Sequence, residues 1–145
     1  MPTIKRNALV SYSIQQMFEL VDNIADYSRF LPWCSKSQIM ERANTEVEAL
    51  LEITWAGVHK NFTTRNKLYP FERIEISLVN GPFHSLTGNW TFVQLNHEAC
   101  KVCLELEFEF TGGILDKLFQ PIFNNIANSL VEAFCKRAVE IYGYK

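Results

Sequence analysis

Residues 121–143 read PIFNNIANSLVEAFCKRAVEIYG, and this stretch decides the fold that the sequence predicts. Its apolar side chains recur at intervals of three and four positions, which places them along one side of a helix. Pro121 suits the first turn of a helix, where no backbone N–H is needed, and Gly143 suits the left-handed conformation that ends one. The apolar stripe is too broad to face water, and it comprises Ile122, Phe123, Ile126, Ala127, Leu130, Val131, Phe134, Ala138 and Ile141. We therefore expect a long helix that lies across a sheet.

The composition is that of one globular domain. A chain of 145 residues, 48% of them hydrophobic, can bury a real core as a single unit spanning residues 1–145. The net charge of −2 gives no overall attraction to DNA or to an anionic membrane. No apolar run approaches the ~20 residues of a membrane span, and the N-terminus has no apolar core of signal-peptide length. We expect a cytoplasmic protein, with any contact to the inner membrane limited to its surface.

The four cysteines do not resemble a disulfide framework, because the rest of the chain can build a core without covalent cross-links. His97, Cys100 and Cys103 have the spacing of metal ligands. The region alternates like a strand, however, and alternation sends Cys100 and Cys103 to opposite faces. We therefore expect Cys100 in the core, Cys103 on the outer face, and no metal site.

Two short helices are predicted near the N-terminus, after a first strand over Thr3–Val10. Ser13 and Gln16 have the spacing of a capping box, so a helix begins there and ends near Asn23. A second helix over Ala25–Phe30 ends at the X-Pro step that follows it, since the residue before a proline avoids the helical conformation.

The region from Ser35 to Phe110 has an apolar period of two and is divided by short turns, which predicts an antiparallel meander. Gly112 and Gly113 separate its last strand from a short helical turn over Ile114–Phe119. A twisted sheet of this size curls, so a long helix laid across it leaves a cavity in the middle. The predicted fold class is α+β, a curved antiparallel sheet wrapped around a long C-terminal helix, with two short helices after the first strand.

Three stretches carry a family resemblance. They are Tyr27-Ser-Arg-Phe-Leu-Pro-Trp-Cys34, then Gly81-Pro-Phe83 with Leu86 and Trp90-x-Phe92, and finally Ala133-Phe134 with Arg137-Ala138 and Ile141-Tyr-Gly143. Together they resemble the START-like, helix-grip family of coenzyme-Q-binding proteins and RatA-type ribosome-association toxins, within the polyketide cyclase-like superfamily. The resemblance covers essentially the whole chain.

This resemblance implies a deep apolar tunnel between the sheet and the long helix. In the coenzyme-Q branch, the tunnel holds ubiquinone or a similar polyprenyl quinone, and the protein acts as a chaperone or carrier that supports respiration. In the RatA branch, the protein binds the large ribosomal subunit and blocks subunit association, which inhibits translation initiation. The three stretches do not separate the two branches.

The residues themselves supply an apolar lining for such a tunnel. The candidate ligand-binding side chains are Trp33, Leu51, Ile53, Trp55, Phe62, Ile76, Leu78, Phe83, Trp90, Phe92, Leu104, Leu106, Phe108, Phe119, Ile122, Phe123, Ile126, Leu130 and Phe134. The alternative is that they fill a solid core. Eleven phenylalanines and three tryptophans favour a cleft over tight aliphatic packing. Trp33 and Phe83 fall in predicted loops, where they form either a lip that contacts lipid or a plug at the end of the core.

The charged residues suit three roles: an ion pair, a contact with a ligand head group, and a contact with phosphate. Arg137 near the buried stripe either pairs with a carboxylate such as Glu107 or Glu109 or contacts a ligand head group, and an ion pair is favoured. His59, Arg65 and Lys67 share the outer face of one strand, which suits either phosphate contacts or ordinary cross-strand charge pairs.

Catalysis has the least support, because the inward-facing rows carry almost no titratable group for acid–base chemistry. We expect a non-enzymatic protein with no catalytic residue and no required cofactor, whose ligand is an apolar lipid such as ubiquinone. The alternative is a RatA-type toxin that acts on the large ribosomal subunit.

Overall fold

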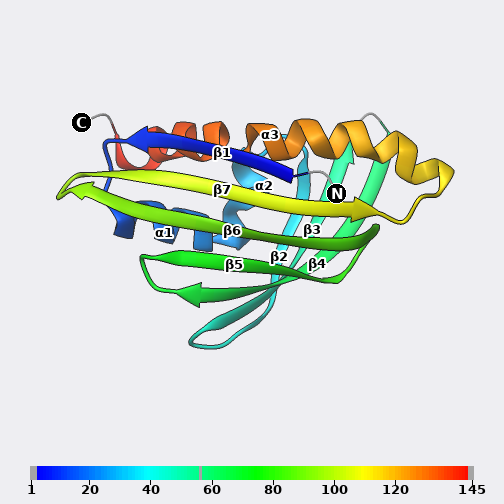
Figure 1. The fold of residues 1–145 in the computed structure, drawn as a ribbon, viewed down its shortest axis with the longest axis horizontal. Helices are drawn as coiled ribbons and strands as arrows, with labels where there is room; N and C mark the ends of the chain where they lie inside the picture. Colours follow the sequence, from blue (N-terminus) through cyan, green and yellow to red (C-terminus); the bar gives the residue numbers. More distant parts are fainter. Residues whose placement is uncertain (1–2, 56, 144–145) are drawn as a thin grey trace.

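A computed structural model describes residues 3–55 and 57–143, and for residues 114–116 it describes the backbone alone (Figure 1). One seven-stranded sheet contains every strand of this part of the chain, in the order β1-β7-β6-β5-β4-β3-β2, with all neighbours antiparallel. The strands are β1 (Thr3–Val10), β2 (Cys34–Arg42), β3 (Glu46–Trp55), β4 (Val58–Tyr69), β5 (Arg73–Asn80), β6 (Phe83–Asn96) and β7 (Ala99–Phe110). The predicted meander is therefore confirmed from β2 to β7. The first strand, β1, pairs with β7 and forms one edge of the sheet.

Two short helical segments follow β1, as predicted. In α1 (Ile14–Asp22), the Ser13 hydroxyl accepts from the Gln16 backbone N–H at 3.1 Å, and the Ser13 N–H donates to the Gln16 side chain at 3.0 Å. The capping box thus satisfies two backbone groups at the start of the helix. The predicted second helix is divided into a 3-10 turn, η1 (Ile24–Asp26), and a single turn of α-helix, α2 (Tyr27–Phe30).

The C-terminal helix is longer than predicted. A separate turn before Pro121 was expected, but α3 (Ile114–Tyr142) is one continuous helix with Pro121 inside it. The proline removes the hydrogen bond to the carbonyl of Lys117 and costs about 3 kcal/mol in a helix interior. Phe119 and Phe123 lie on either side of it, and both rings contact Phe83, so packing against the sheet holds the helix together. At the other end, Gly143 has φ 79° and ends α3 as predicted.

The helix α3 runs along β1 and β7, and the sheet curves away from it through β5, β4 and β3 (Figure 1). Its C-terminal end is joined to the N-terminal segment by hydrogen bonds from the Tyr142 hydroxyl to the Gln16 carbonyl (2.9 Å) and from the Tyr12 hydroxyl to the Gly143 carbonyl (2.5 Å). One edge of the sheet is therefore packed closely against the helix. The other strands approach α3 less closely.

The predicted inward and outward faces are confirmed with two exceptions. Along β7, alternate residues from Cys100 to Phe108 are buried, while Glu105, Glu107 and Glu109 are exposed. Trp55, the last residue of β3, is 45% exposed although it has the parity of the buried Ile53. Ile141 is 51% exposed, because Tyr142, four residues after Ala138, takes the next place on the buried face.

Candidate functional site

A cavity lies between the inner face of the sheet and α3, and its volume is about 90 Å³. Its walls come from β3 to β7, from α3, and from the segment that contains η1, α2 and Trp33. It lies where β3, β4 and β5 curve away from the helix. Eleven of the predicted ligand-binding residues line it: Trp33, Leu51, Ile53, Phe62, Ile76, Trp90, Leu106, Phe123, Ile126, Leu130 and Phe134.

The other eight predicted residues lie elsewhere. Trp55 is exposed, as described above, and is therefore not part of the lining. The remaining side chains are buried or half-buried in the surrounding core: Leu78, Phe83, Phe92, Leu104, Phe108, Phe119 and Ile122. The structure therefore favours the alternative that these seven side chains fill the core.

The open space is smaller than the tunnel that the resemblance implies. Pockets for drug-sized ligands measure ~300–1,000 Å³, whereas this cavity has about 90 Å³. The difference is made by aromatic rings that fill one end of the space between sheet and helix. An apolar cavity of ~150 Å³ holds benzene, so this one takes a single ring only if its walls yield, and a long polyprenyl tail would have to leave it.

Phe83 is a plug at the end of the core beside the cavity, where it contacts the lining residues Phe62 and Phe123. It is 4% exposed, and ring centroids of Phe62, Phe110, Phe119 and Phe123 lie 4.8–6.0 Å from its own. Trp33 is 6% exposed and lines the cavity wall. The alternative in which these two side chains form an exposed lip is therefore wrong.

Two polar side chains of β4, Thr64 and Asn66, interrupt the apolar wall. They are 6% and 8% exposed, and the Thr64 hydroxyl donates to the Asn66 Oδ1 at 3.2 Å. Asn66 was not among the predicted lining residues, although alternation along β4 from Phe62 predicts that it faces inward. The other lining residues that were not predicted are Ile24, Tyr27, Ala49, Thr64 and Leu86.

The cavity has no group suited to acid–base chemistry among its described lining residues, which include no carboxylate, imidazole, amine or thiol. Tyr27 is the only one that titrates, and its hydroxyl donates to the Val21 carbonyl. Burial raises the pKa of Tyr27 far above its ordinary value, and the negative charge of Asp22 raises it further. Tyr27 therefore stays neutral, and the lining can bind a ligand without moving a proton.

Arg137 forms an ion pair, but its predicted partner is wrong. Its guanidinium lies 3.0 Å from Asp26 in η1 and 3.5 Å from Glu140, and it sits 5.1 Å from the centre of the Phe30 ring. Glu107 and Glu109 face the solvent on the opposite side of β7, so they cannot meet a side chain of α3. Arg137 thus joins α3 to the segment that carries the cavity wall.

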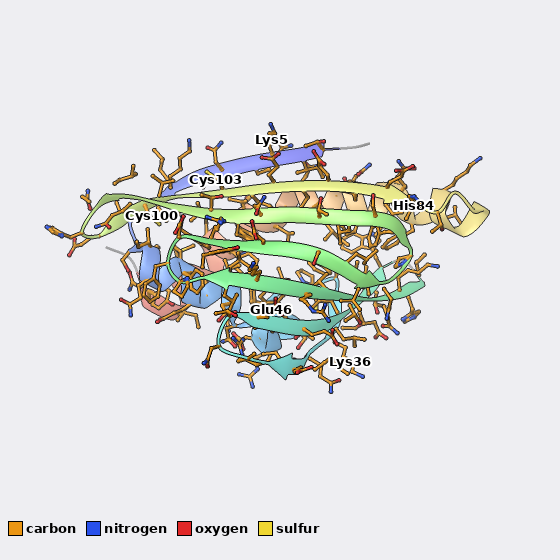
Figure 2. The ribbon with its side chains drawn as sticks, turned by 60° about the horizontal axis from the view of Figure 1, so that its bottom comes forward. Lys5, Lys36, Glu46, His84, Cys100 and Cys103 are labelled. Carbon is orange, nitrogen blue, oxygen red and sulfur yellow. The ribbon has the colours of Figure 1, made fainter. Side chains whose placement is uncertain are left out.

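Charges on the outer face are paired across strands. Arg65 lies 2.9 Å from Glu48 on the neighbouring strand, and Lys67 stands opposite Glu46 in the strand register. Figure 2 places Lys5, Lys36 and His84 on three separate strands around this face. The interpretation as cross-strand charge pairs is therefore confirmed for Arg65, and the basic side chains labelled in Figure 2 are dispersed.

The cysteine positions are as predicted: Cys100 is fully buried, and Cys103 is partly exposed on the other face of β7 (Figure 2). Among the residues that the structure describes, no three His, Cys, Asp or Glu side chains are grouped to hold a metal ion. Within the same ranges, no helix is both long and apolar enough to cross a bilayer.

Comparison with known proteins agrees with this architecture. Residues 10–135 match the family described as polyketide cyclase / dehydrase and lipid transport. The chain belongs to this family.

Three proteins of known name align with most of this chain. The ribosome association toxin RatA of Vibrio cholerae is 45% identical over 143 residues, which is 99% of each chain. A coenzyme Q-binding protein COQ10 homolog B from Xenopus laevis mitochondria is 25% identical, over 93% of this chain and 57% of that one. The Zhui aromatase/cyclase of Streptomyces sp. R1128 has the same fold, with a TM-score of 0.83, 16% identity, and coverage of 94% and 93% of the two chains.

Proposed function

We propose that this protein associates with the ribosome, as its RatA relatives are named for doing. The observation that supports it is 45% identity over 99% of both chains, which leaves no domain of the relative without a counterpart. The proposed partner is the large subunit, and the proposed consequence is that the subunits do not join and translation initiation is inhibited. A ribosomal partner also places the protein in the cytoplasm.

The sequence alone favoured lipid binding and gave ribosome association as the alternative, and this proposal puts ribosome association first. The net charge is −2, and Arg65 and Arg73 are already held by carboxylates. We therefore expect neither arginine to contact phosphate. Each cation that does so should add about 0.7–0.9 to the log–log slope with which affinity falls as salt is added.

Co-sedimentation tests the proposal directly. Purified protein is centrifuged through sucrose with isolated large subunits, isolated small subunits, or both together at a magnesium concentration that favours joining. Pelleting with the large subunit alone, together with loss of the joined particle, is the expected result. Failure to pellet with either subunit at low salt would rule the proposal out.

A second function is favoured by the cavity itself. We infer that the cavity binds the ring of ubiquinone or of a similar isoprenoid lipid, without catalysis, so that the protein can hold or carry it. The support is an apolar chamber of about 90 Å³ whose described lining has no acid–base group, together with the likeness to a coenzyme Q-binding protein. In this arrangement the tail lies outside the chamber, where surface contact with the inner membrane can receive it.

Organic extraction of the purified protein, followed by mass spectrometry, tests this second function. Ala49 is 1% exposed and lines the cavity, so Ala49→Leu should fill the space and abolish the extracted lipid. Ala43→Leu, on an exposed loop, is the matched control and should retain it. Circular dichroism confirms that both variants fold. An extract without isoprenoid lipid, from protein that also fails to bind added quinone, would exclude this function.

A further inference from the structure

We propose that Asn66 is the polar anchor of the cavity, and that its side-chain amide donates a hydrogen bond to a carbonyl or ether oxygen on a ring-sized ligand. The ligand class is then an oxygenated ring, as opposed to a plain hydrocarbon or an unsubstituted acyl chain. This inference rests on the second proposed function, the binding of a ligand in the cavity.

The side-chain amide of Asn66 contacts its neighbour on β4 through its oxygen. Thr64 Oγ1 donates to Asn66 Oδ1 at 3.2 Å, so the oxygen of the amide is already engaged. The amide nitrogen, Nδ2, is then directed away from Thr64. Within residues 3–55 and 57–143, Asn66 has no hydrogen bond other than this one for its side chain.

The amide nitrogen faces open space. The fully covered side-chain atoms that lack a partner in the described part of the chain are Ser85 Oγ and Arg137 Nε, and Asn66 Nδ2 is not among them. Asn66 as a whole is 8% exposed and lines the cavity, so the open space beside it is the cavity. A donor in an otherwise apolar wall is the feature that selects ligand orientation in small-molecule sites.

The energetic argument follows from the position of this donor. A buried amide that loses its partner pays a desolvation penalty, so an apolar ligand that displaces water from Nδ2 binds at a disadvantage. A ligand with an oxygen acceptor replaces that water bond. A neutral hydrogen bond of this kind corresponds to about a five- to tenfold preference for the oxygenated ligand.

The experiment compares two ligands of the same shape. Tetramethyl-1,4-benzoquinone carries two carbonyl oxygens and has no open ring position for thiol addition, while 1,2,4,5-tetramethylbenzene has the same four methyl groups and no oxygen. Trp33 and Trp90 line the cavity and report quinone binding by fluorescence quenching, in full-length protein that carries Trp55→Phe to remove the exposed tryptophan. The affinity of the hydrocarbon is measured by its displacement of the quinone.

Asn66→Leu removes the donor at nearly constant volume and should weaken quinone binding about five- to tenfold without weakening hydrocarbon binding. Asn61→Leu, exposed on the same strand, is the matched control and should leave both affinities unchanged. Thr64→Val removes the hydroxyl that orients the amide, and it should reduce the quinone preference even if Asn66→Leu fails to fold.

The outcomes separate the two proposals. Equal quinone affinity in the wild type and in Asn66→Leu would overturn the anchor while leaving ligand binding intact. If Asn66→Leu does not fold, an unchanged preference in Thr64→Val would overturn it in the same way. Binding of neither ligand by the wild type would overturn the cavity function and the anchor together.

Discussion

Replacement of Phe83 by alanine distinguishes a plug from a lip. The ring is 4% exposed and contacts four other phenylalanines, from β4, β7 and α3. A buried phenylalanine removes roughly 150 Å² from water, which at ~25 cal/mol per Å² corresponds to about 4 kcal/mol. This agrees with the ~3–5 kcal/mol that buried Phe→Ala changes cost. Since domains are stable by only ~5–15 kcal/mol, Phe83→Ala should lose a large share of the free energy of unfolding.

Urea denaturation followed by circular dichroism measures this loss. With a urea dependence of about 2 kcal/mol per M, the midpoint should fall by about 2 M. His84→Ala is the matched control, because His84 is the next residue and is exposed, and it should change the free energy of unfolding by less than about 0.5 kcal/mol. A cost below about 1 kcal/mol for Phe83→Ala, accompanied by weaker partitioning to vesicles, would show that the ring is a surface lip and that the plug is wrong.

Three further changes test other parts of the structure. Gly88→Ala should destabilise the protein by ~1–3 kcal/mol in urea denaturation, because a Cβ there would lie 2.4 Å from Leu106 Cδ2 and 2.7 Å from a backbone oxygen. Arg137→Met should lower the free energy of unfolding by about 1–2 kcal/mol, since its ion pair with Asp26 is only partly exposed. If the ion pair accounts for this loss, the same substitution made in an Asp26→Asn protein should cost much less. Burial raises the pKa of Cys100 from 9.0 to about 11, so its contribution is present below pH 9 and is lost as the pH rises to 11. Between pH 9 and pH 11, the free energy of unfolding of Cys100→Ala should fall less steeply with pH than that of the wild type, and the two slopes should differ by up to ~1.4 kcal/mol per pH unit. Equal slopes in the two proteins would contradict the burial of the thiol.

Periodicity predicted the sheet well because one face of each strand is buried and the other is solvated. The alternation from Cys100 to Phe108 survives in the structure, and the same rule would have placed Asn66 in the cavity wall. The rule weakens at the ends of elements. Trp55 has the right parity for the inner face, yet it is the last residue of β3 and is 45% exposed.

The sequence could not predict which aromatic side chains line open space and which fill it. Phe83 and Phe123 both face the interior, but only Phe123 borders the cavity, because Phe83 packs into the ring cluster at its end. Nor could local preference predict a helix that continues through Pro121, since the packing of Phe119 and Phe123 against Phe83 is a contact across some forty residues of sequence.

The sequence by itself determined the order of the elements, the faces of the strands, the capping box of α1 and the end of α3 at Gly143, since each depends on neighbours within a few positions. Only the tertiary structure decided the size of the chamber, the plug at its end and the partner of Arg137. These depend on how far β3 to β5 curve away from α3, and that distance is set by many long-range contacts acting together.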